Sequence, residues 1–133
     1  MPAKRLLVID ENLNPRLATE LNKRGFVARR VRYFGLSGEK DHELLPALKE
    51  QLAGSDWMLI TADDRMPHTH GPLLDELGIT VATIDPRVPD GRLLEEWRRD
   101  VVHRWVHKME EQAQGTIRRY SERAHRSWTP IKR

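Results

Sequence analysis

Acidic side chains that directly follow apolar segments are the residues of this sequence best suited to chemistry. Asp10 follows the apolar run Leu6–Ile9, and Asp63 and Asp64 follow a second such run. Carboxylates that lie close together without a matching Lys or Arg repel one another, and a hard divalent cation such as Mg²⁺ or Mn²⁺ relieves this repulsion. A cation of this kind can generate a hydroxide and hold a phosphodiester for in-line hydrolysis. The acids therefore predict a metal site for phosphodiester cleavage.

The elements that must position these acids alternate between strands and helices. Continuous apolar runs are typical of strands buried on both faces of a parallel sheet. The predicted strands cover residues 6–9, 26–31, 57–61 and 79–84, and the predicted helices between them begin near Pro15, Asp41 and Pro72. This alternation indicates parallel strands joined by helical crossovers. We expect a three-layer, Rossmannoid α/β fold with a four-stranded, mainly parallel sheet.

The carboxyl ends of parallel strands share one edge of the sheet, where open α/β sheets bind their ligands. If the first and third predicted strands are neighbours, Asp10 and Asp63 converge at this edge, and Asp41 can join them from the start of a helix. We expect these three acids to hold Mg²⁺ or Mn²⁺. The residues expected to assist them are Asp64, Glu11, Glu43 and Asn12. Taken singly, each acid is also an ordinary turn or cap former, and only the shared edge favours the metal site.

Residues 91–133 differ in character from residues 1–90. The later segment holds 11 Lys and Arg against 6 Asp and Glu, whereas the earlier one holds 12 against 14. From Leu94 to Met109, apolar residues recur every three or four positions, which predicts a long amphipathic helix. We therefore divide the chain into an α/β core over residues 1–90 and a basic helical extension over residues 91–133 that packs on the core or on a partner.

The positive charge of this extension suits a polyanion or an acidic partner, or it is an ordinary solvated helix face. Apolar residues left exposed on the helix would need covering, which favours a homodimer.

Composition excludes several classes of protein. A length of 133 residues suits one domain with its own core. Cysteine is absent, which excludes disulfides, thiolate zinc sites and thiol nucleophiles. No apolar run reaches the length of a membrane span, and the N-terminus leads into a short strand rather than a signal peptide. We expect a cytoplasmic protein without a membrane partner.

Basic side chains near the predicted edge are candidates for contacts with phosphate groups. Arg29, Arg30 and Arg32 could line an RNA path, since phosphate contacts dominate such affinity, or they could protect an edge strand. His68 and His70 lie in the segment after Asp63 and could contact a scissile phosphate or transfer a proton, or they could be loop residues.

The chain resembles the PIN-like family of small bacterial proteins over roughly residues 5–86. The family is related to the PIN-domain ribonuclease toxins of toxin–antitoxin pairs (VapC type). The resemblance rests on an ordered set of segments rather than on one motif. These segments are Leu7–Leu13, Pro15–Leu17, Gly35–Ser37, Asp41–Leu45 and Leu59–Asp63.

This resemblance implies a PIN-like fold, an acidic site that cleaves RNA with Mg²⁺ or Mn²⁺, and a small antitoxin protein as partner. Asp10, Asp41 and Asp63 match the acids of the family. Arg65 stands where the family often has a further Asp, and Asp64, one residue earlier, is its candidate substitute. Two functions follow: a metal-dependent ribonuclease, the toxin of such a pair, or a weakly active or inactive PIN-like module that docks a partner or nucleic acid, with Arg65 among its RNA contacts.

A phosphorylation switch of the receiver type is a further alternative. Residues 7–11 and 59–62 are similar to receiver strands. A receiver, however, needs a phospho-accepting Asp at the end of the strand between them, where this chain has Arg30–Arg32. A receiver also needs a Lys after its last strand, where this chain has Pro86 and Arg87. Both absences count against a receiver.

Overall fold

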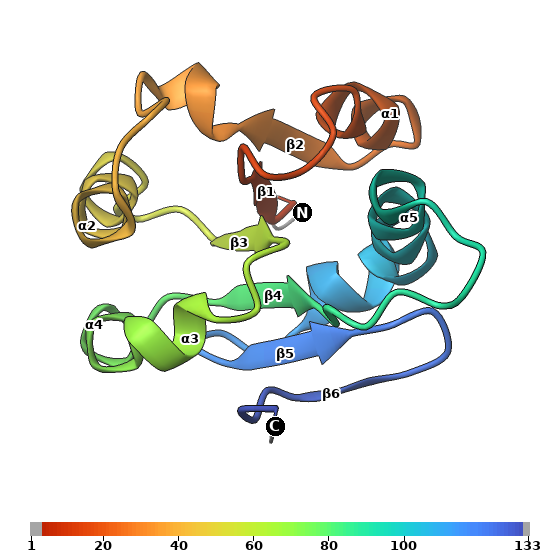
Figure 1. The fold of residues 1–133 in the computed structure, drawn as a ribbon. Coiled ribbons are helices and arrows are strands. Elements are labelled where there is room, and N and C mark those ends of the chain that lie inside the picture. The colour runs from red at the N-terminus through yellow and green to blue at the C-terminus, as the bar shows by residue number, and fades with distance from the viewer. Residues whose placement is uncertain (1–3, 132–133) are drawn as a thin grey trace.

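The computed structural model describes residues 4–131, which form a single six-stranded sheet in the order β2-β1-β3-β4-β5-β6 (Figure 1). Strands β1 to β5 run parallel, and β6 is the antiparallel edge strand. The strands are β1 (Leu6–Ile9), β2 (Val27–Arg30), β3 (Trp57–Thr61), β4 (Val81–Ile84), β5 (Ile117–Tyr120) and β6 (His125–Ser127). The parallel α/β architecture is confirmed, and so is the edge position of β2.

Helices cover both faces of the sheet and bury two apolar layers (Figure 1). One face carries α1 (Leu17–Lys23) and α5 (Leu94–Glu111), and the other carries α2 (Asp41–Gln51), α3 (Met66–Thr69) and α4 (Gly71–Leu77). A short 3-10 helix, η1 (Val31–Phe34), follows β2. Apolar side chains at helical spacing explain this arrangement, because each helix turns one stripe toward the sheet. None of the described helices is both long and apolar enough to cross a membrane.

The prediction of four strands is wrong, because residues after α5 return to the sheet. Strand β5 pairs with β4, Ile84 opposite Tyr120, and β6 folds back on β5. Helix α5 lies in the segment where we expected a long amphipathic helix, whereas β5 and β6 occupy the rest of the expected helical extension. Strand β5 was not predicted because its sequence, Ile-Arg-Arg-Tyr, contains two arginines. One of them, Arg119, is buried in the structure. Buried arginine is rare unless a carboxylate pairs with it.

Helix α5 buries its apolar stripe inside this chain. Trp97, Val101, Val102, Val106 and Met109 all lie in the core, where α5 packs against β4 and β5. The exposed apolar face on which the homodimer was predicted is therefore covered by the sheet, and the homodimer stays a prediction without that support.

The strand order places the ends of β1 and β3 side by side. Ile9 pairs with Ile60, and the amide of Asp10 donates to the Ile60 carbonyl at 3.0 Å. The chain leaves β1 toward β2 on one side, while β3 lies on the other, so this is the point where the strand order reverses. The expected adjacency of the first and third strands is confirmed.

Candidate active site

Thr61, the last residue of β3, organises the site through three hydrogen bonds. Its hydroxyl donates to Asp10 Oδ2 at 2.8 Å and accepts from Asn12 Nδ2 and from the Asp63 amide, both at 3.0 Å. Asp10 Oδ1 accepts from the Glu11 amide at 2.8 Å. The Asp10 carboxylate is therefore held at both oxygens, and Asp63 is tied to the same hydroxyl. Sequence reasoning missed Thr61 as a site residue, although a buried Thr at a strand end beside acids is a usable signal.

Burial and mutual repulsion define the electrostatics of Asp10, Asp41 and Asp63. Burial raises the pKa of Asp10, and the charges of Asp41 and Asp63 raise it further against the lowering effect of its hydrogen bonds. Burial likewise raises the pKa of Asp41, with a further contribution from Asp63, while His70 and His42 act in the opposite direction. Asp41 Oδ2 lies 3.7 Å from His70 Nε2. Within residues 4–131, none of the three acids forms an ion pair with Lys or Arg.

Two of the predicted supporting acids face elsewhere. Glu11 accepts from the Ser37 hydroxyl and from the Gly38 amide, both at 2.9 Å, so it fastens the loop between η1 and α2. Glu43 is exposed, and its side chain lies beside Glu39 and 3.7 Å from His42 rather than beside Asp41. Asn12 does join the site, since its Oδ1 accepts from the Ala62 amide at 3.0 Å in addition to its bond with Thr61.

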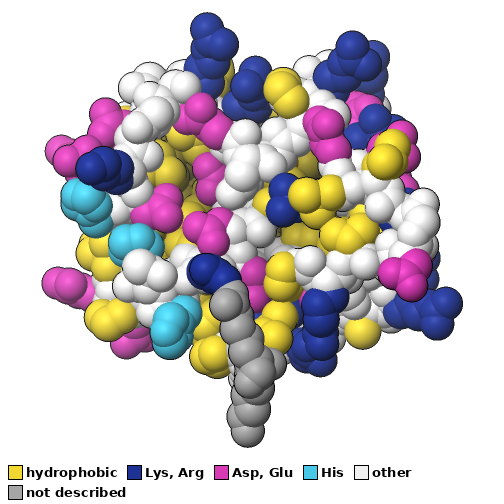
Figure 2. Space-filling model, in the orientation of Figure 1, with side chains coloured by type: hydrophobic (Ala, Val, Ile, Leu, Met, Phe, Trp, Pro, Cys, Tyr) yellow, Lys and Arg dark blue, Asp and Glu magenta, His cyan; other side chains and the backbone are white. Residues whose placement is uncertain are grey.

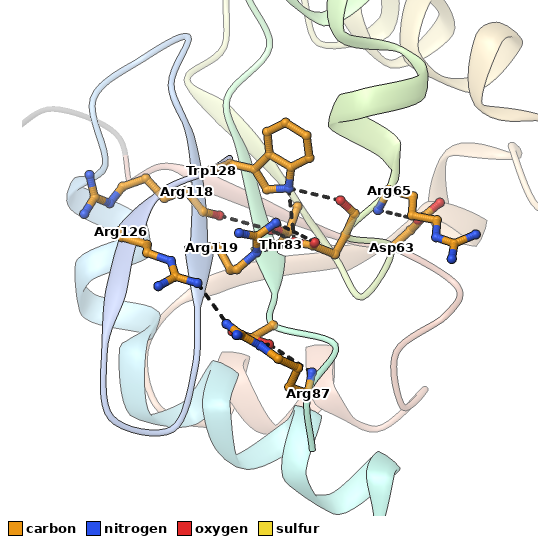
Figure 3. A network of polar contacts seen from close by, with 10 residues as sticks. Asp63, Arg65, Thr83, Arg87, Arg118, Arg119, Arg126 and Trp128 are labelled. Carbon is orange, nitrogen blue, oxygen red and sulfur yellow. Dashed lines mark hydrogen bonds and ion pairs between the residues drawn. The ribbon is translucent and has the colours of Figure 1, made fainter. Parts of the chain in front are cut away.

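Asp64 turns away from the other acids and toward β5. Arg119 donates to both of its carboxylate oxygens, at 2.7 and 2.6 Å, and Thr83 donates to Oδ1 at 3.0 Å (Figure 3). The indole Nε1 of Trp128 donates to the Asp64 carbonyl at 3.0 Å and to Oδ1 at 3.1 Å. The structure therefore does not bring Asp64 into the cluster where sequence reasoning placed it, because Arg119 binds its charge within the core.

Asp85, at the end of β4, is also neutralised. Arg87 donates to its two oxygens at 2.9 and 2.7 Å, and Arg126 lies 3.9 Å away (Figure 3). Burial acts to raise the pKa of Asp85, but the hydrogen bonds and charge of Arg87 outweigh it and hold the pKa below its ordinary value. Asp85 is thus a paired structural acid.

A pocket of about 830 Å³ opens beside Asp63. Its walls include Asn12, Asp63, Arg65, His68 and, from later in the chain, Trp128. Figure 2 shows acidic side chains gathered over the middle of this face of the molecule, with histidines to one side toward α2 and α3. Arg65 and His68 therefore lie next to the candidate metal ligands, on the side where a phosphate could approach them.

The other predicted RNA contacts lie at the β2 edge. Arg29, Arg30 and Arg32 line a shallower hollow of about 330 Å³ together with Tyr33, whose ring centroid lies 5.3 Å from the Arg29 guanidinium. This hollow shares no lining residue with the pocket beside Asp63.

The oxygen donors of the acidic cluster suit a hard divalent cation in their chemistry. Their charges act on one another, and no Lys or Arg within residues 4–131 compensates them. As the side chains stand, no three His, Asp or Glu residues in the described part of the chain converge closely enough to hold an ion. Binding of an ion by Asp10, Asp41 and Asp63 would therefore require side-chain movement.

A family model described as "PIN like domain" matches residues 6–71. This range contains Asp10, Thr61 and Asp63, together with Asp41, and excludes Arg119 and Trp128. No curated protein and no solved structure matches the chain.

Proposed function

We propose, from the premise that this chain belongs to the PIN-like domain family through residues 6–71, that it is a ribonuclease that hydrolyses RNA with Mg²⁺ or Mn²⁺. The observation that carries the proposal is the acidic cluster of Asp10, Asp41 and Asp63. Burial and, after it, the charges of the neighbouring acids raise the pKa values of Asp10 and Asp41, and no Lys or Arg within residues 4–131 pairs with the cluster. A half-buried group of carboxylates that repel one another is costly to maintain and is characteristic of functional sites.

The residues of the site have distinct tasks in this proposal. Asp10, Asp41 and Asp63 would hold the ion, which when bound supplies an activated water and positive charge at the phosphodiester. Thr61 fixes the direction of the Asp10 carboxylate through its 2.8 Å hydrogen bond. Asn12 secures the start of the β3–α3 turn by accepting from the Ala62 amide. Arg65 and His68, which line the pocket, would contact phosphate oxygens of the RNA.

Cleavage of single-stranded RNA by the purified protein, with Mn²⁺ or with EDTA, tests this function. We expect cleavage only with the metal, and a loss of at least about a hundredfold in Asp10→Asn and in Asp63→Asn, since both remove a proposed ligand. Asp75→Asn, an exposed change on α4, serves as the matched control and should cleave normally. Unchanged cleavage by both Asp10→Asn and Asp63→Asn would contradict the proposal.

The relationship of the family to ribonuclease toxins extends the proposal to a toxin–antitoxin pair. In that setting RNA cleavage would arrest growth, and a small antitoxin protein would block the site. Expression in a bacterial host should slow growth for the wild-type chain and not for Asp10→Asn. Equal effects on growth would dissociate the toxin role from the acidic site.

A second candidate function is a PIN-like module that binds without turnover. Two observations favour it: Arg65 occupies the position where the family often carries a further acid, and no three potential ligands converge on one point within residues 4–131. Titration with Mn²⁺ separates the two candidates, because the module requires no ion at the acidic edge.

A further inference from the structure

Nearly half of the residues that line the pocket beside Asp63 come from parts of the chain that the acidic cluster does not use. Besides the β3–α3 turn, its walls come from the segment after β4, from α5 and from the C-terminal segment, which contribute Arg87, Arg98 and Trp128. These three residues lie outside the range 6–71 matched by the family model. The volume of about 830 Å³ falls within the range of roughly 300–1,000 Å³ that is usual for small-ligand sites. It is large enough for a nucleotide.

The charge of the pocket walls favours an anion. Arg87 binds Asp85, but the side chains of Arg65 and Arg98 form no ion pair or hydrogen bond within residues 4–131. Asp64 also lines the pocket, but its charge is bound by Arg119. Two arginines therefore remain available in the pocket that Asp63 also lines. The planar guanidinium with its several donors is well suited to phosphate.

Trp128 provides a rigid aromatic surface in the same pocket. Its indole Nε1 donates to Asp64 at two atoms, 3.0 and 3.1 Å away, and the Arg119 guanidinium lies 5.5 Å from its ring centroid (Figure 3). The side chain is half-buried, and its remaining surface lines the pocket. An indole already held in place loses little conformational freedom when a ligand stacks on it. Nucleobases stack on such aromatic side chains when they are unpaired.

We propose that this pocket binds an unpaired nucleotide of single-stranded RNA next to the cleaved phosphodiester, with its base against Trp128 and a neighbouring phosphate on Arg65 and Arg98. The inference rests on the proposed ribonuclease function and names the substrate class of that site. A base inside a duplex is stacked on both faces and paired along one edge, so it cannot stack on Trp128. The C-terminal half of the chain thus selects unpaired RNA, while the acids of the N-terminal half act on it.

Binding is measured without cleavage, in the Asp10→Asn background with EDTA. Fluorescence anisotropy follows a labelled single-stranded RNA of about eight nucleotides, compared with the same RNA annealed to its complement. We expect Trp128→Ala to weaken RNA binding about tenfold, because one stacking contact is lost, and Trp128→Phe to retain affinity within about threefold. The duplex should bind less tightly than the single strand, because its bases are not free to stack on Trp128.

The phosphate contact of Arg98 is tested in the same Asp10→Asn background. Arg98→Gln should reduce the slope of log affinity against log salt by about 1, the signature of one lost phosphate contact. Arg104→Gln, on the same helix but outside the pocket, should leave the slope unchanged. If Trp128→Ala does not fold, as judged by circular dichroism, then Trp128→Phe and Arg98→Gln decide the question.

Several results would overturn the inference. An RNA affinity of Trp128→Ala within twofold of that of the Asp10→Asn protein would contradict the proposed site. An unchanged salt slope for Arg98→Gln would contradict it as well. Equal losses in Trp128→Ala and Trp128→Phe would show that Trp128 acts through its bond to Asp64 rather than by stacking. Equal affinity for the duplex would contradict unpaired RNA as the substrate class. Binding that depends on Trp128 in a protein that cleaves no RNA with Mn²⁺ would instead reject the nuclease function and leave the site intact.

Discussion

Two groups of acids lie on the same edge of the sheet and differ in how their charge is compensated. At the ends of β1 and β3, the charges of Asp10, Asp63 and the nearby Asp41 act on one another, and none of the three pairs with Lys or Arg within residues 4–131. At the β4 and β5 side, Asp64 is bound by Arg119 and Asp85 by Arg87. Asp63 and Asp64 are neighbours in sequence, yet they belong to different groups. The comparison shows what separates structural acids from candidate metal ligands. The difference is an ion pair with an arginine side chain, rather than residue type or position in a strand.

The buried pair on the compensated side gives the largest expected effect. Arg119 is 2% exposed and Asp64 is 9% exposed. Removing one partner of such a pair leaves an uncompensated charge in the core. Arg119→Leu should therefore lower the free energy of unfolding by about 3–5 kcal/mol in denaturant titrations.

Arg126→Leu is the matched control for Arg119→Leu. Its side chain is 56% exposed and lies 3.9 Å from Asp85, so its loss should cost less than about 1 kcal/mol. Equal costs for the two substitutions would show that the Asp64–Arg119 pair is not a structural element of the core.

For the acids without an arginine partner, Asp10, Asp41 and Asp63, we predict that metal binding depends on pH. Because the pKa values of Asp10 and Asp41 are raised above the ordinary value of 3.8, these carboxyls take up protons at a higher pH than an ordinary Asp does. An ion requires the deprotonated form. The affinity for Mn²⁺, measured by calorimetry, should therefore fall as the pH is lowered through these raised values, by about tenfold per pH unit for each proton displaced. An affinity that stays constant down to the ordinary value would place the ion elsewhere.

Glu43 gives the smallest expected effect. The resemblance to the family and its place near Asp41 favoured a supporting role, but the side chain is exposed and faces His42. Glu43→Gln should change RNA cleavage by less than about twofold and the free energy of unfolding by less than about 0.5 kcal/mol. A large loss of cleavage would extend the acidic cluster along α2.

The sequence was sufficient for the parts of the site that depend on local pattern and parallel topology. Apolar runs that end in acids located Asp10 and Asp63 at one edge, and a helix start located Asp41. The direction of the Asp64 side chain could not be predicted from the sequence. Its hydrogen-bond partners Arg119 and Trp128 lie 55 and 64 residues later in the chain. Strand β5 was missed for the same reason: two consecutive arginines favour a solvated segment until a distant carboxylate is known to bind one of them.

A Mn²⁺ titration of the wild type, Asp63→Asn and Asp64→Asn by calorimetry tests the central claim most directly, with thermal unfolding recorded for each protein. Asp63 is a proposed ligand without a cationic partner, and Asp64 is a paired acid of the core. Asp63→Asn should lose at least about tenfold in Mn²⁺ affinity while its unfolding temperature without metal stays near that of the wild type. Asp64→Asn should unfold at a clearly lower temperature but bind Mn²⁺ with nearly wild-type affinity below that temperature. Equal Mn²⁺ affinity in Asp63→Asn and the wild type, or loss of binding in folded Asp64→Asn alone, would contradict the account.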